Sequence, residues 1–132
     1  MSAIDAAERW LEARRPEPPP GLRDRMLEAV RAVGGPPRAD GRDGAAAPER
    51  RPASVPEGVP SVAALLGEAA LDRLRVVLAA PSGRDAALDL LAADALLTYA
   101  CEAAAEAGPE ALDATARVYG PPRFEALLRE RP

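Results

Sequence analysis

Apolar residues recur along most of this chain at intervals of about three and four, the spacing of helices that bury one face. Alanine and leucine dominate the apolar positions, and β-branched residues are few, so the sequence favours helices and offers little material for a sheet. The pattern therefore predicts an all-α protein. Helices are expected over residues 2–15, 22–33, 61–79, 84–107 and 109–119, with a last short helix that carries Phe124, Leu127 and Leu128.

Polar and glycine residues mark several of the expected helix ends. Ser2 stands where it can cap the first helix, with Asp5 in the acidic position of a capping box. Gly34 suits a left-handed residue at the end of the second helix. Ser82 and Asp85 are expected to cap the fourth helix in the same way as Ser2 and Asp5 cap the first.

Residues 34–60 separate the first two helices from the rest. They contain five glycines and six prolines among few apolar side chains, which is typical of a flexible, disordered linker. The predicted organisation is a two-helix amphipathic arm (1–33), this linker, and a four-helix bundle (61–132). A small alanine-rich bundle buries little apolar area, so we expect it to gain stability from self-association or from docking of the arm.

Charge and cysteine content bear on partners and location. The chain has 17 arginines and no lysine against 21 acids, and residues 60–132 hold the whole net charge of −4. This balance argues against binding to nucleic acid. Three acids within the most apolar stretch, residues 86–105, argue against a membrane span. One cysteine and an amphipathic, charged amino terminus predict a cytoplasmic protein.

Four residue types that serve most enzyme sites are missing: the sequence has no His, Lys, Asn or Gln. Catalytic roles would fall to carboxylates, arginines, hydroxyls and Cys101 alone. Glycine-rich phosphate loops, nucleophile elbows and metal-ligand spacings are also absent from the sequence. We therefore expect no metal or cofactor, and the composition favours a binding part over a catalyst.

The helix at 84–107 carries apolar residues nearly all round, which is typical of a central helix in a bundle. At about 100° per residue, Leu90, Asp94, Leu97 and Cys101 fall within about one quadrant. We therefore expect the Asp94 carboxylate to face the interior of the bundle.

A buried charge needs a partner of opposite sign. Arg73 lies among apolar residues on the helix at 61–79, and Arg117 lies on the helix at 109–119. The sequence predicts that one of these two arginines pairs with Asp94. In the alternative interpretation, Asp94, Thr98 and Cys101 line a ligand pocket.

The segment LAADALLTYACE, residues 91–102, resembles the "LAGDALLTLAFE" helix of trans-isoprenyl diphosphate synthases. The resemblance implies an all-helical fold and condensation of allylic diphosphates with magnesium held by two Asp-rich motifs. This chain has no D-D-x-x-D motif and none of the family's lysine or histidine diphosphate contacts, and Ala93 replaces the family's glycine. No catalytic residue of the family can be carried over to it.

The leading functional hypothesis is a non-enzymatic interaction or scaffolding module that associates with itself or with a protein partner. The tethered arm would supply a second contact at raised local concentration. The rival hypothesis is a ligand-binding or minimal catalytic module at Asp94, Thr98 and Cys101. A binding module should expose an apolar stripe, whereas a ligand site should show a cavity around these three residues.

Overall fold

The computed structural model describes residues 2–35 and 55–130. This part of the chain contains six helices and no strand, so the predicted all-α class is confirmed. The predicted linker falls largely on residues 36–54, which lie outside the described residues. The helices are α1 Ala3–Glu12, α2 Pro20–Gly34, α3 Ser61–Ala79, α4 Arg84–Ala107, α5 Pro109–Val118 and α6 Pro121–Arg129.

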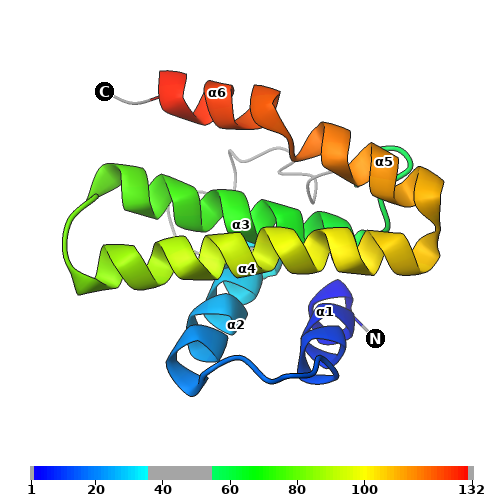
Figure 1. The fold of residues 1–132 in the computed structure, drawn as a ribbon, viewed down its shortest axis with the longest axis horizontal. Helices are drawn as coiled ribbons and strands as arrows, with labels where there is room; N and C mark the ends of the chain where they lie inside the picture. Colours follow the sequence, from blue (N-terminus) through cyan, green and yellow to red (C-terminus); the bar gives the residue numbers. More distant parts are fainter. Residues whose placement is uncertain (1, 36–54, 131–132) are drawn as a thin grey trace, which may run out of the picture.

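The helices α3 and α4 form an antiparallel hairpin through the middle of the molecule (Figure 1). The arm helices α1 and α2 lie on one side of this hairpin, and α5 and α6 lie on the other (Figure 1). Ala7 and Leu11 of α1 and Met26 and Val30 of α2 are buried in the same core as Leu66 of α3. The arm therefore docks on the central hairpin of its own chain and adds to its hydrophobic core.

Small side chains make up most of the contact between α3 and α4. Alanine and glycine let two helix backbones approach closely, because little side-chain volume separates them. On α3 the buried residues are Ala63, Ala64, Leu66, Gly67, Ala69, Ala70 and Leu71. On α4 they are Ala86, Asp89, Ala92, Ala93, Leu96, Ala100, Ala103 and Ala104. The side of α4 that faces the core is thus an alanine face, and most of its leucines point elsewhere.

The predicted capping box at the start of α1 is confirmed. The backbone N–H of Asp5 donates to the Ser2 hydroxyl at 3.1 Å, and the backbone N–H of Ser2 donates to the Asp5 carboxylate at 3.3 Å. At the end of α2 the prediction is wrong, because Gly34 still belongs to the helix. Gly35 follows with φ of −75°, so α2 ends without a left-handed residue.

The predicted cap of α4 by Ser82 and Asp85 is also wrong. Gly83 occupies the cap position with φ of +99°, and no side chain caps the helix. The carboxylate of Asp85 instead accepts a hydrogen bond from Arg25 at 2.9 Å. The predicted cap fails because the helix begins one residue later than a Ser82 cap requires, with Gly83 at the cap position.

Tyr119, at the turn between α5 and α6, is fixed against α3. Its hydroxyl donates to the carbonyl oxygen of Ala64 at 3.1 Å, and its ring lies directly over Gly67. Arg123 of α6 forms an ion pair with Glu68 of α3 at 3.2 Å. Burial, with the neighbouring Glu68 charge, raises the pKa of Tyr119. These contacts hold the carboxy-terminal helices on the central hairpin.

Candidate functional site

The predicted ion pair of Asp94 with Arg73 or Arg117 is wrong, because Asp94 is exposed. The guanidinium of Arg73 binds Asp72 at 2.8 Å and Asp89 at 3.5 Å. Arg73 does lie in a protected place, with 12% of its side chain exposed, and its partner Asp89 is 5% exposed. The buried arginine therefore has a carboxylate partner on α4, but this partner is Asp89.

Arg117 lies at the surface and needs no buried partner. Its side chain is 78% exposed and forms an ion pair with Asp113, one turn earlier on α5, at 3.0 Å. Arg129 and Glu125 form the matching pair on α6 at 3.9 Å. Exposed pairs of this kind contribute only a few tenths of a kcal/mol each.

A cluster around Asp89 joins three helices, and sequence reasoning missed it. Arg25 of α2 donates to the carboxylate of Asp89 at 3.0 Å and to that of Asp85 at 2.9 Å. These hydrogen bonds raise the pKa of Arg25 above its usual value. Since Asp89 also meets Arg73 of α3, the cluster fastens the arm to both central helices.

The quadrant of α4 that contains Leu90, Asp94, Leu97 and Cys101 exists as expected, but it faces outward. Leu90 is 51% exposed, Asp94 is exposed, and Leu97 and Cys101 are half-buried. The opposite side of the helix carries the alanines that pack against α3. The assumption that leucines mark the buried side is what fails here, because small residues build the core contact.

Asp94, Thr98 and Cys101 therefore lie together on or beside an open helix surface. The Thr98 hydroxyl donates to the backbone carbonyl oxygen of Asp94 at 3.0 Å, within the helix itself. This arrangement leaves the Thr98 proton engaged with backbone and places the Asp94 carboxylate in solvent. It does not supply the enclosed, convergent groups that a small-molecule site uses.

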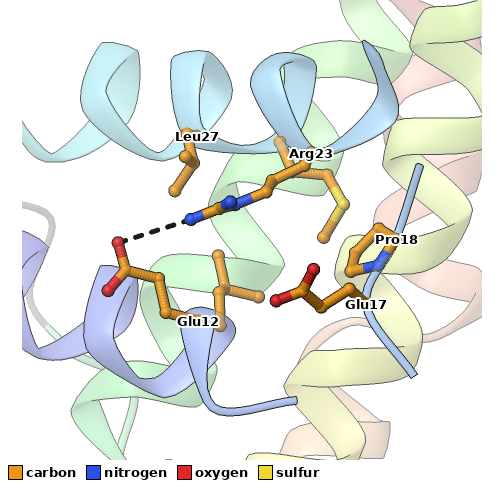
Figure 2. A pocket seen from close by; sticks show the side chains of 7 residues that line it. Glu12, Glu17, Pro18, Arg23 and Leu27 are labelled. Atoms are coloured by element: carbon orange, nitrogen blue, oxygen red, sulfur yellow. Dashed lines mark ion pairs between the residues drawn. The ribbon is translucent and has the colours of Figure 1, made fainter. Parts of the chain in front are cut away.

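A small cavity does lie between α1 and α2 (Figure 2). Its volume of about 10 Å³ is close to what one water molecule needs. An ion pair between Arg23 and Glu12 at 3.6 Å crosses one side of it, as the dashed line in Figure 2 shows. Its lining residues are Leu11, Glu12, Glu17, Pro18, Arg23, Met26 and Leu27. The cavity is too small for a metabolite.

A second set of polar contacts fastens α1 to the carboxyl end of α4. The indole N–H of Trp10 donates to Glu106 at 2.7 Å, and Arg14 donates to the same carboxylate at 3.0 Å. The Arg14 guanidinium stacks 3.8 Å from the centre of the Trp10 ring, and Tyr99 meets that ring edge-on at 5.9 Å. The hydrogen bonds from Trp10 and Arg14 lower the pKa of Glu106. These contacts are structural, because the side chains of Trp10, Arg14 and Glu106 bind one another.

No three acidic, histidine or cysteine side chains in residues 2–35 and 55–130 are grouped to hold a metal ion. No helix of the same two ranges is both long enough and apolar enough to cross a membrane. Comparison with protein-family models, curated proteins and solved structures finds no match to this chain. The resemblance of residues 91–102 to isoprenyl diphosphate synthases thus stays confined to that one segment.

The best candidate site is the outward side of α4, which we call the α4 outer face. Its exposed members are Ala87, Leu90, Leu91, Asp94, Thr98 and Glu102. Leu90 and Leu91 are 51% and 57% exposed and adjoin each other on the longest helix of the described chain. With Leu128 of α6, these two leucines are the most exposed large apolar residues among those that the structure describes.

Proposed function

We propose that this protein is a non-enzymatic protein-interaction module and that the α4 outer face is its partner-binding surface. The carrying observation is the exposure of Leu90 and Leu91 on a helix whose core contact consists of alanines. Full burial of a fully exposed leucine contributes about 1.5–3 kcal/mol, and because each of these two is already about half buried, covering both contributes about that amount in total. Within residues 2–35 and 55–130, the fold leaves about half of each of these two side chains exposed.

Rigid support of α4 also favours this proposal. Arg25 and Arg73 bind its first half through Asp89, while Trp10 and Arg14 bind its last turn through Glu106. A helix held at both ends presents its outer side chains in fixed positions. Binding to such a surface costs little ordering entropy.

The test compares affinity capture by three versions of the full-length chain from cells that produce it. The first is the wild type and the second is Leu90→Gln with Leu91→Gln. The third is Leu128→Gln, a matched control because Leu128 is 54% exposed but lies on α6. Light scattering during gel filtration shows in parallel whether the bound partner is a second copy.

The proposal predicts a stoichiometric partner that the wild type and Leu128→Gln retain and the double variant loses. Circular dichroism should show the same helix content in all three proteins, because the substituted side chains lie outside the core. A partner that the double variant holds as tightly as the wild type does would refute the proposal. Turnover of a small molecule by the purified chain would also refute the non-enzymatic part.

A further inference from the structure

We propose that the occupant of the α4 outer face is an amphipathic helix of another protein, with apolar residues flanked by lysine or arginine. This inference rests on the proposed function and adds the chemistry of the partner. It follows from the charges that accompany Leu90 and Leu91 on the face.

The region around the α4 outer face is acidic. Residues 85–116 contain seven acids and no basic residue. Four of these acids form ion pairs with arginines of α2, α3 and α5 or with Arg14, which follows α1: Asp85, Asp89, Glu106 and Asp113. Asp94 and Glu102, both on the outer face, form no ion pair with another described residue. The face therefore combines an apolar patch with two available negative charges.

A partner that carries positive charge gains from the exposed carboxylates of Asp94 and Glu102. Basic side chains on a helix, placed beside its apolar stripe, match this distribution.

The same charges disfavour a second copy of this chain as the occupant. Two α4 helices packed through their outer faces would bring Asp94 and Glu102 of each copy close to those of the other. Arg84, at the first position of α4, is the only basic residue that each helix offers in return. Like charges brought together across an interface cost binding free energy, so the acidic face selects a different, basic partner.

The face also sets the size of the partner helix. From Leu90 to Glu102 the helix rises about 18 Å, which another helix of about 12 residues matches. Its apolar residues should recur at three- and four-residue spacing to cover Leu90 and Leu91. Its basic residues should flank that stripe to reach Asp94 and Glu102.

The probe for the test is a fluorescent helical peptide of about 18 residues, made of leucine, lysine and alanine with leucines at helical spacing. The matched probe carries glutamate at every lysine position. Fluorescence anisotropy measures the affinity of each peptide for the full-length chain. We expect the lysine peptide to bind at least about tenfold more tightly than the glutamate peptide. Added salt should weaken the binding of the lysine peptide.

Two pairs of variants locate the binding. Leu90→Gln with Leu91→Gln should weaken the lysine peptide at least about tenfold, whereas the control Leu128→Gln should not. Asp94→Arg with Glu102→Arg should reverse the preference toward the glutamate peptide. Glu57→Arg with Glu110→Arg changes the net charge by the same amount at exposed positions off the face, and it should keep the original preference.

The outcomes separate the two proposals. Equal binding of the lysine peptide to the wild type and to the Leu90/Leu91 variant would show attraction to overall charge, and it would overturn this inference. A wild-type dimer that the same variant abolishes would overturn it too, while it would support the α4 outer face as an interaction surface. If neither peptide binding, self-association nor capture of a cellular partner depends on Leu90 and Leu91, both proposals fail.

Discussion

Arg25 of α2 and Asp89 of α4 join the amino-terminal arm to the central hairpin through a hydrogen-bonded ion pair of 3.0 Å. Asp89 is the more deeply buried of the two, with 5% of its side chain exposed against 25% for Arg25. Arg73 binds the same carboxylate. Loss of Asp89 would therefore remove one ion-pair partner from both Arg25 and Arg73. The pair thus makes the arm part of the folded core.

Replacing Asp89 with alanine should lower the free energy of unfolding by about 1.5–3 kcal/mol, since Arg25 and Arg73 lose their shared buried carboxylate and keep only Asp85 and Asp72. Asp94→Ala should change that free energy by less than about 0.5 kcal/mol, because Asp94 is exposed. Urea unfolding followed by circular dichroism measures both. A larger loss for Asp94→Ala than for Asp89→Ala would contradict the observed orientation of α4.

Gly67 is expected to tolerate no side chain. A Cβ atom at this position would lie 2.6 Å from the ring of Tyr119, so Gly67→Ala must displace the ring. We expect a loss of about 1–3 kcal/mol in the free energy of unfolding, as in other overpacked cores. Gly21→Ala is the control, since a Cβ atom there meets nothing within 4 Å and alanine favours the helix. Similar stabilities for the two variants would argue against the Tyr119 packing.

Alkaline pH should destabilise the protein through Tyr119. Its pKa in the fold is raised above the ordinary value of 10.0, so the fold favours the protonated phenol. The corresponding stability is fully present below pH 10 and is lost as the pH rises through the folded-state pKa. Unfolding at pH 9 and 11 should show this loss in the wild type and a smaller one in Tyr119→Phe. An equal loss of stability in both proteins would assign the alkaline destabilisation to groups other than Tyr119.

Acid should weaken the contacts of Glu106 with Trp10 and Arg14. Its pKa in the fold lies below the ordinary value of 4.5, so its contribution is present above that pH and is lost as the pH falls through the folded-state pKa. Trp10 is the single tryptophan of the chain, and its emission should shift to the red over this step. Glu106→Gln should remove the step, because glutamine does not titrate. An unchanged step in that variant would assign it to other carboxylates.

The limits of α3 and α4 were predictable because local chemistry sets them, whereas α1 ends at Glu12, before the predicted residue 15, and α2 begins at Pro20, before the predicted residue 22. Prolines, glycines and the Ser2 capping box act within a few residues of the ends they define, and α3 and α4 begin and end where expected. Asp85 shows where this local reasoning stops. It does not cap α4, and its carboxylate accepts a hydrogen bond from Arg25, which stands 60 positions away in the sequence.

The orientation of α4 was not predictable by the same reasoning. Helical spacing correctly grouped Leu90, Asp94, Leu97 and Cys101, but spacing alone does not say which side of a helix faces inward. Hydrophobicity predicted that the leucines of α4 face the core. The close contact with α3 instead places the alanines of α4 in the core. A run of small residues repeated on both α3 and α4 was the one available signal.

Site-specific photo-crosslinking tests the assignment of the α4 outer face most directly. A benzophenone amino acid replaces Leu91 in one full-length protein and Leu128 in another, and each is irradiated in the cells that produce it. We expect the protein labelled at position 91 to form a discrete adduct with one other protein, and the protein labelled at 128 to lack that adduct. An absence of adducts from position 91, or the same adducts from both positions, would contradict the assignment.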